Sequence, residues 1–327
     1  MNSPPAGILL LLVDGLGLGD PDAGRNPLAV ARTRWFQCFR NRIPAIDGCV
    51  VVSTDASLGV PGLPQSATGQ TALLTGLNAP LLAGRHIQGF CTPTLTALLA
   101  EQSLFRTFSR RGARVACANA FPTSVLQRHR FPSVTTVAMR AAGIRLRNLD
   151  DLAGGRALHH DFTNTLLNLR GSSMPIFSPE EAAECLAEIT ATHDLTYYEY
   201  IQTDLAGHAQ NMDRAVALLE GLDRFISRLV ARLDLSRHFL VLASDHGNVE
   251  DLATASHTWN RIPTMIWGHG KERLARRIHA LTDITPALLT LWNSHSQGSA
   301  TDTRGPVRPE TRDPELSSRV PSLSSGG

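Results

Sequence analysis

The chain of 327 residues is poor in lysine, in aromatic residues and in long apolar segments. Lys271 is the only lysine among 31 basic residues, and the arginines are scattered, so we expect no concentrated basic face for nucleic acid. The apolar run 8–13 is too short for a signal peptide or a membrane span. We therefore expect a cytoplasmic protein that binds neither nucleic acid nor a membrane. The sequence leaves the oligomeric state open.

Cysteines are few and follow no ligand spacing. The five cysteines are odd in number, widely separated and embedded in apolar sequence. This pattern predicts buried free thiols and excludes a disulfide framework or a cysteine-rich metal site. With 43% hydrophobic residues, the chain can nevertheless bury one large core.

Apolar runs of strand length alternate with stretches of helical periodicity. The runs cover residues 7–13, 115–118, 197–202, 239–243 and 264–267, and the helical stretches cover 95–111, 179–190, 212–233 and 284–291. Such alternation predicts an α/β fold, in which a mostly parallel sheet is covered by helices on both faces as a three-layer α/β/α sandwich.

Two regions depart from this alternation. Residues 123–178 are rich in Arg, Gly and Pro and lack a regular strand and helix order, so we expect a small inserted cap over the site. Residues 294–327 are rich in Ser, Pro, Gly and Arg, which predicts a disordered tail. The main domain should therefore span residues 1–293.

Acidic residues and histidines follow two of the predicted strands. Asp245 and His246 come directly after one apolar run, and Asp204 follows another, with His208 four residues later. Carboxylate and imidazole suit Zn²⁺ or Mn²⁺, and open α/β sheets bind ligands at the carboxyl ends of their strands. Two such clusters suggest two divalent metal ions, although the Asp204 spacing also fits a surface pair on a helix.

A third pattern combines small hydroxyl residues with glycine just before an apolar helical stretch, in residues 64–76. Ser66 would then lie at the start of a helix, where backbone N–H groups point toward an anion such as phosphate. Thr68 is the competing hydroxyl, and we favour Ser66 because it directly precedes a small residue.

These patterns, taken in order, resemble the motifs of the alkaline phosphatase superfamily, and most of all its cofactor-independent phosphoglycerate mutase and phosphopentomutase branch. The segments that carry the resemblance are Asp14-Gly15, the Ser66 segment, Asp204-x-x-Gly-His208, Asp245-His246-Gly-Asn248, His257-Thr258-x-Asn260 and Asp283-Ile284-Thr285-Pro286. The resemblance implies an alkaline-phosphatase-like fold and assigns the metal ligands. One ion would be bound by Asp204, His208 and His257, and the other by Asp14, Asp245 and His246, with Ser66 as the nucleophile that bridges both.

The interval between Ser66 and Asp204 is shorter than the large inserted domain of the mutases requires, and Gln70 replaces the histidine of their nucleophile loop. We expect Arg85, Gln70 and Asn260 to contact a small phosphorylated substrate. Without a closed cap, a phospho-Ser66 intermediate would be hydrolysed, which predicts a phosphohydrolase of a small organophosphate. The alternatives are a phosphomutase with a small cap, a phosphodiesterase, and a non-catalytic metal-dependent binding protein. A sulfatase is disfavoured because its Cys/Ser-x-Pro-x-Arg motif is absent.

Overall fold

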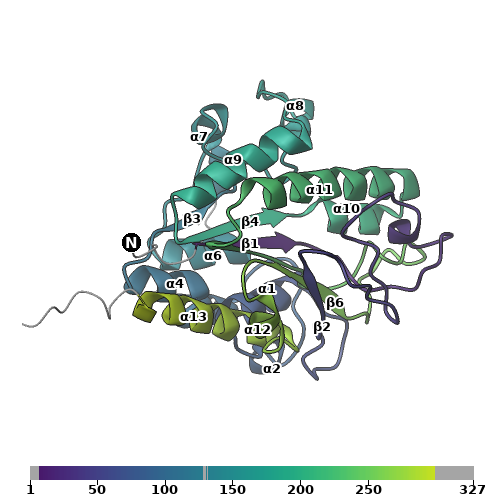
Figure 1. Cartoon of the computed structure of the whole chain (residues 1–327), viewed down its shortest axis with the longest axis horizontal. Coiled ribbons are helices and arrows are strands. Elements are labelled where there is room, and N and C mark those ends of the chain that lie inside the picture. Colours follow the sequence, from purple (N-terminus) through teal and green to yellow (C-terminus); the bar gives the residue numbers. More distant parts are fainter. Residues whose placement is uncertain (1–6, 128–129, 131, 299–327) are drawn as a thin grey trace, which may run out of the picture.

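The computed structural model describes residues 7–127, 130 and 132–298. Its centre is a six-stranded sheet in the order β2-β6-β5-β1-β4-β3 (Figure 1). The strands are β1 (Gly7–Val13), β2 (Val50–Thr54), β3 (Val115–Cys117), β4 (Leu195–Tyr200), β5 (His238–Ala243) and β6 (Ile262–Trp267).

The sheet is mostly parallel. The central strand β1 pairs in parallel with β4 and β5, and β4 pairs in parallel with β3. Only β6 runs against its neighbours, because it is antiparallel to both β5 and β2. All seven residues of β1 are buried, which explains why its sequence is continuously apolar and does not alternate. The predicted α/β fold with a mostly parallel sheet is confirmed.

One face of the sheet is covered by α9 (Pro179–Ala191) and α11 (Met212–Arg232), which pack against each other above it in Figure 1. The predicted apolar stripe of α11 faces the core, since Ala215, Leu219, Leu222, Ile226 and Leu229 are all buried. Helical spacing of these positions therefore explains how α11 lies along the sheet.

The opposite face is covered by α1 (Ser66–Thr75), α3 (Pro93–Gln102), α4 (Leu104–Arg110), α6 (Val134–Ala141), α12 (Lys271–Ala275) and α13 (Leu281–Gly298). Short elements complete the described chain: η1 (Pro27–Ala29), α2 (Ala79–Leu82), α5 (Thr123–Leu126), α7 (Leu149–Ala153), α8 (Thr165–Leu169) and α10 (Gln202–Ala209).

Several element boundaries differ from the sequence expectation. The helix expected over 95–111 is divided into α3 and α4 at Ser103, whose hydroxyl accepts a hydrogen bond from Arg106 N and so starts a new helix. The strand expected over 197–202 ends at Tyr200, because Gln202 already begins α10. Strand β2 was not among the predicted strands; it is partly buried over residues 50–53 and buried at Thr54.

Residues 123–178 contribute helices to both faces of the sheet. Within them, α6 packs against α3 and α4 and buries Val134, Ala138 and Met139 in the core, whereas α7 and α8 lie beside α9 (Figure 1). A cap over the site therefore stays a prediction for this segment. Helix α13 continues to Gly298, into the expected tail, and the remainder of that tail lies outside the described residues. Among the described helices, none is long and apolar enough to cross a membrane.

Candidate metal centre

Three adjacent parallel strands bring the candidate ligands to one edge of the sheet. Asp14 directly follows β1, and Asp245 and His246 follow β5. Asp204 lies on α10, immediately after β4. Because β5, β1 and β4 are neighbours and parallel, their carboxyl ends meet at the same edge, where open α/β sheets bind ligands.

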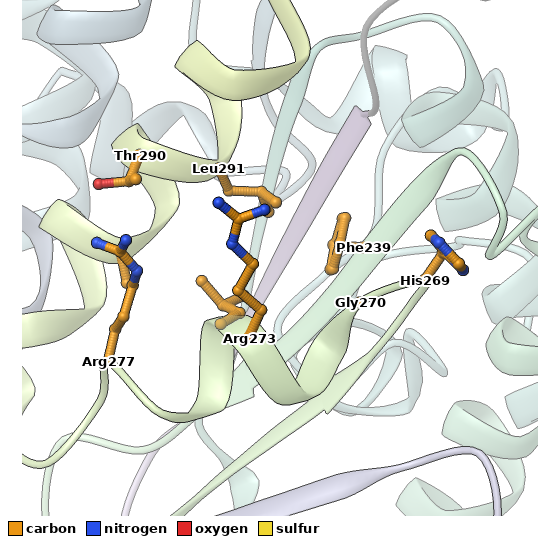
Figure 2. A pocket seen from close by; sticks show the side chains of 9 residues that line it. Phe239, His269, Gly270, Arg273, Arg277, Thr290 and Leu291 are labelled. Carbon is orange, nitrogen blue, oxygen red and sulfur yellow. The ribbon is translucent and has the colours of Figure 1, made fainter.

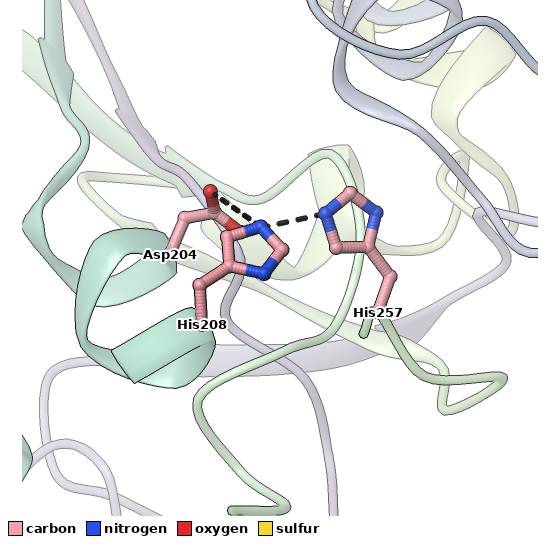
Figure 3. Close-up of side chains that lie close together, drawn as sticks. All are labelled: Asp204, His208 and His257. Atoms are coloured by element: carbon pink, nitrogen blue, oxygen red, sulfur yellow. Dashed lines mark ion pairs between the residues drawn. The ribbon is translucent and has the colours of Figure 1, made fainter. Parts of the chain in front are cut away.

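An outer group consists of Asp204, His208 and His257, whose ligand atoms all lie within 4.8 Å of one another (Figure 3). His208 Nε2 is 3.3 Å from Asp204 Oδ2, and His257 Nε2 is 3.6 Å from Asp204 Oδ1. Asp204 and His208 are an i,i+4 pair on a helix and also lie beside His257. Their spacing therefore fits both the helical pair and the ligand cluster that the sequence left open. These three residues are a suitable donor set for one divalent ion.

An inner group consists of Asp14, Asp245 and His246. His246 Nε2 lies 3.2 Å from Asp14 Oδ1 and 3.7 Å from Asp245 Oδ2. The second compact set of potential ligand atoms is Asp14, His246 and Asp204, so Asp204 connects the two groups. Asp245 lies slightly further back, where its carboxylate accepts hydrogen bonds from Gly15 N and from Gln70 Nε2.

The three histidines share one orientation. His246 Nδ1 lies near Gly247 O, His208 Nδ1 near Ala255 O, and His257 Nδ1 near Pro64 O, at 3.4, 2.7 and 2.8 Å. A neutral imidazole in this arrangement donates Nδ1–H to the carbonyl and directs the Nε2 lone pair toward the carboxylates. Lone pairs facing anions require a proton or a metal ion between them, and this is the usual arrangement of metal-binding histidines.

Burial and mutual repulsion perturb the inner group. Desolvation, together with the nearby Asp245, raises the pKa of Asp14 well above its usual value. Desolvation disfavours the charged form of His246, but Asp245 and Asp14 outweigh it and raise its pKa to about 10. Asp14 Oδ1 is buried and accepts no hydrogen bond from the described residues. A divalent cation would neutralise this acidic cluster, so the donor set fits one.

Ser66 is the first residue of α1, and its Oγ lies 2.9 Å from His246 Nε2. The preceding Gln65 provides no side-chain cap, and Thr68 N donates to Ile87 O, which leaves the N–H groups of Ser66 and Ala67 available to an anion. Thr68 is fully buried, and its hydroxyl donates to Gln65 O and accepts from Ile87 N. Ser66 is therefore the hydroxyl that faces the candidate ligands.

Two glycines permit this close packing. Gly15 has φ +70°, and a Cβ there would lie 2.9 Å from Asp204 Cα. Gly69, in α1, would bring a Cβ within 2.7 Å of Asp245 O. Side chains at these positions would push the ligand loops and the Ser66 helix apart.

Glu250 is a residue that the sequence analysis missed. It is almost fully buried, and its carboxylate accepts hydrogen bonds from Gly17 N, Asn248 N, Thr258 Oγ1 and Asn260 Nδ2. These donors come from the three loops that carry Asp14, His246 and His257. Asn248 adds a link to α10, because its Nδ2 lies 2.7 Å from Asp204 Oδ1. The only sequence signal was a carboxylate close to the Asp245-His246 motif.

The three expected substrate contacts lie in different places. Gln70 is buried and donates to Asp245 Oδ2 at 3.0 Å, so it contacts the inner group from within the core. Asn260 donates to Glu250 and accepts from Arg40, so it belongs to the hydrogen-bonded loops around Glu250. Arg85 is exposed and lines a cavity of about 480 Å³ that also includes Gln65, the neighbour of Ser66. Of the three, Arg85 alone lines an open space beside the nucleophile candidate.

A separate cavity lies between α12 and α13, and Figure 2 shows Arg273 and Arg277 on one of its sides. Its floor includes Phe239, near the amino end of β5, whereas His246 follows the carboxyl end of that strand. This cavity of about 320 Å³ is thus at the opposite edge of the sheet and shares no residue with the candidate ligands.

Comparisons with known proteins agree with this description. Residues 175–295 match the family model of the metalloenzyme superfamily. The 2,3-bisphosphoglycerate-independent phosphoglycerate mutase of Ruegeria sp. is 31% identical over 121 residues, covering 35% of this chain and 24% of that protein. The enzyme of the same name from Parasynechococcus marenigrum is 30% identical over 165 residues, covering 45% and 30%. The chain thus spans 24% and 30% of the length of these two relatives.

Solved structures share the fold. The PH0037 protein from Pyrococcus horikoshii superposes with a TM-score of 0.57 at 17% identity, covering 89% of this chain and 98% of that one. An alkaline phosphatase from a Shewanella species gives 0.50 at 11% identity, covering 88% and 99%. Together, these comparisons show that residues 175–295 resemble the metalloenzyme superfamily, that part of the chain is similar to 2,3-bisphosphoglycerate-independent phosphoglycerate mutases, and that the fold is shared with a solved alkaline phosphatase.

Proposed function

We propose that the chain is a two-metal phosphoryl-transfer enzyme that hydrolyses a small organophosphate through a phospho-Ser66 intermediate. The observation that carries this proposal is the position of Ser66. Its hydroxyl opens a helix and lies 2.9 Å from His246 Nε2, next to a cluster of acidic and imidazole side chains. A serine so placed has both an activating group and an anion-binding helix end within reach.

The outer group would hold one divalent ion, and the inner group, together with Ser66, would hold the other. Mn²⁺ and Zn²⁺ both suit carboxylate and imidazole donors. Such ions supply positive charge that stabilises the transferring phosphoryl group and favours ionisation of the serine hydroxyl. The acidic inner group, with its raised pKa values, is the part of the site that most needs this charge.

The residues of the chain perform the remaining tasks. Ser66 Oγ loses its proton and forms a bond to phosphorus while the ester P–O bond breaks, and the alcohol leaves after taking up a proton. The N–H groups of Ser66 and Ala67, at the start of α1, donate hydrogen bonds to the phosphoryl oxygens. Water then attacks phospho-Ser66, which releases inorganic phosphate and restores the serine.

Hydrolysis is favoured over transfer within the substrate because Ser66 is only partly buried. The described residues between Ser66 and Asp204 form helices on both faces of the sheet and the strands β3 and β4. They form no separate large domain that would cover Ser66. We therefore assign water as the acceptor of the phosphoryl group, and the exposed Arg85 as a contact for the substrate's anionic part.

The test uses protein loaded with Mn²⁺ or Zn²⁺, with the metal content measured, and a panel of aryl phosphates, phosphodiesters and small phosphometabolites. We expect free phosphate to appear, Ser66→Ala to abolish its release, and a single phosphate on Ser66 to be detected by mass spectrometry after rapid quenching. Ser236→Ala, an exposed serine outside the site, is the matched control.

Each alternative gives a different result. Transfer of phosphate within the substrate, with none released, would identify a phosphomutase. Preference for diesters would identify a phosphodiesterase. Ligand binding without turnover by fully metal-loaded protein would contradict the proposal and leave a non-catalytic metal-dependent binding protein.

A further inference from the structure

A second cavity, separate from the candidate ligands, lies at the carboxyl end of β4. It has a volume of about 510 Å³ between the 161–169 segment and α11. Its walls are largely apolar and include Phe162, Leu166 and Leu218. Leu169, at 77% exposure, is the most exposed large apolar residue in the described part of the chain and also lines the cavity. These dimensions suit a small organic molecule with an apolar body.

Two polar groups in this cavity lack partners. The side chain of Tyr200 is almost fully buried, at 1% exposure, yet its hydroxyl forms no hydrogen bond with the described residues. Arg214 is exposed, and its guanidinium forms no ion pair within the same part of the chain, although Arg224 nearby pairs with Glu180. The Tyr200 hydroxyl borders the cavity and has no protein partner among the described residues, so it is free to hydrogen-bond a molecule bound there.

Tyr200 and Arg214 both line this cavity and could contact the same bound group. Burial and Asp161 raise the pKa of Tyr200, whereas the charge on Arg214 lowers it. An acidic group positioned between them would accept a hydrogen bond from Tyr200 and pair with Arg214.

Asp161 is the one acidic residue that lines the cavity, and its carboxylate is already occupied. Its oxygens accept hydrogen bonds from His159 Nδ1, Asn164 N and Leu166 N at 2.7, 3.2 and 2.9 Å. The carboxylate therefore stabilises the conformation of residues 159–166. Its interactions do not neutralise Arg214.

The backbone around the cavity is held in an uncommon conformation. Phe162 and Asn164 have φ angles of +43° and +66°, which bulky side chains rarely adopt. Phe162 is fixed there by stacking on Tyr200 and Phe225, with ring centroids 5.2 and 4.7 Å away. Strain of this kind persists where the surrounding structure determines the shape of a site.

Gly221 keeps the cavity open. It lies in the interior of α11, where glycine is less favourable than alanine, and it lines the cavity. A Cβ built at Gly221 meets no atom within 4 Å. Packing against the core therefore does not require glycine at this position, and a larger side chain there would extend into the cavity.

We propose that this cavity binds an amphipathic organic anion, with an apolar body of about the size of one ring against Phe162 and Leu218, and an acidic group between Tyr200 and Arg214. The inference goes beyond the proposed function, because none of these residues is a candidate metal ligand. Its test therefore does not depend on phosphoryl transfer.

The experiment is isothermal titration calorimetry of the metal-loaded full chain with 3-phenylpropionate, compared with the neutral 3-phenylpropanamide. We expect saturable binding of the carboxylate and binding of the amide that is about tenfold weaker, since the amide lacks the charge. Tyr200→Phe and Arg214→Gln should each weaken carboxylate binding by about tenfold. Arg237→Ala, an exposed arginine outside the cavity, should bind as the wild type does.

Gly221→Leu is the decisive variant. Leucine should fill the cavity and abolish binding, while the thermal midpoint stays at or above that of the wild type, because a helix-interior glycine has been removed. Gly221→Ala should give a smaller loss of affinity, with a thermal midpoint at or above that of the wild type. No binding by the wild type at millimolar concentrations would overturn the proposal. So would binding that survives in Gly221→Leu and is displaced by inorganic phosphate, because the carboxylate would then be bound at the metal centre.

Discussion

The inner and outer groups of candidate ligands meet at Asp204 yet lie in different surroundings. The side chains of Asp245 and His246 have no exposed area, whereas His208 is 34% exposed. In the inner group, charge can be balanced only by a proton, a metal ion or neighbouring protein groups. In the outer group, water can share that task at His208, although His257 is buried. We infer that the inner group determines the chemistry of Ser66, while the outer group controls how easily its ion exchanges with solvent.

The difference follows from how the chain supports each group. Asp14 and Asp245 come directly after β1 and β5, the strands at the centre of the sheet, and are fixed by its register. His208 lies near the end of α10, and His257 lies in the loop before β6. The outer ligands therefore depend on a short helix and a loop, which move more readily than strand ends.

The largest expected contrast is between His246→Ala and His208→Ala. His246 is a fully buried candidate ligand beside Ser66 Oγ, and water cannot readily take its place, so its loss should lower kcat for phosphate release by about 10²–10³-fold even when metal is in excess. Loss of His208 should weaken metal binding, and added Mn²⁺ or Zn²⁺ should restore much of the rate. Steady-state phosphate release over a metal titration measures both effects. Equal, metal-independent losses in the two variants would contradict the distinction between the groups.

The second prediction concerns Glu199, which lies behind the inner group. Burial, with a smaller contribution from the charge on Asp245, raises the pKa of Glu199 from 4.5 to about 7, although Thr135 Oγ1 donates to its carboxylate. An acid with a raised folded pKa contributes stability below its unfolded pKa, and loses that contribution as the pH rises through the folded value.

In metal-free protein, the free energy of unfolding of the wild type should therefore fall, relative to Glu199→Gln, by about 3 kcal/mol as the pH rises from below 4.5 to above 7. Urea unfolding of both proteins across this range measures the difference. Glu101→Gln, at an exposed site on α3, should follow the wild type. A difference that is constant with pH would show that Glu199 has the same pKa in the folded and the unfolded protein, and would contradict the prediction.

The same contrast explains what the sequence could and could not predict. Asp14 and Asp245 directly follow continuous apolar runs, so strand signals alone bring them to one edge once the strands are parallel and adjacent. The sheet order, with β1 between β4 and β5, depends on long-range pairing that local patterns do not encode. The division of 95–111 at Ser103 was missed because helical periodicity continues through the capping residue.

Contacts that cross between loops were also beyond the sequence. Glu250 has four hydrogen-bond donors, and they come together only after three loops have folded over it. Gln70 and Asn260 occupy motif positions that suggested substrate contact, yet they bond to Asp245 and Glu250. Residue type identifies a polar group in such a site, whereas its direction depends on tertiary packing.

The third prediction tests whether Glu250 supports both the inner and the outer group of candidate ligands. Glu250→Gln keeps the size of the side chain but replaces one acceptor oxygen by a donor and removes the charge. Because Glu250 bonds to the loops of Asp14, His246 and His257, we expect weaker binding at both metal sites, by about 10–100-fold, as for other groups that orient ligands. Metal-binding isotherms give the two affinities, and Glu272→Gln, on the surface, is the control. Loss at one site alone would show that the groups are supported separately.

The smallest expected effect distinguishes the two hydroxyls of α1, of which only Ser66 faces the inner group. Thr68→Val removes the hydrogen bonds to Gln65 O and from Ile87 N, which should lower the free energy of unfolding by about 1 kcal/mol. The rate of phosphate release per metal-loaded molecule should change little, because the Thr68 hydroxyl is directed toward the 85–88 loop and away from His246. Urea unfolding and phosphate release measured on the same preparations provide the comparison. A loss of turnover as severe as that of Ser66→Ala, with stability intact, would transfer the nucleophile assignment to Thr68.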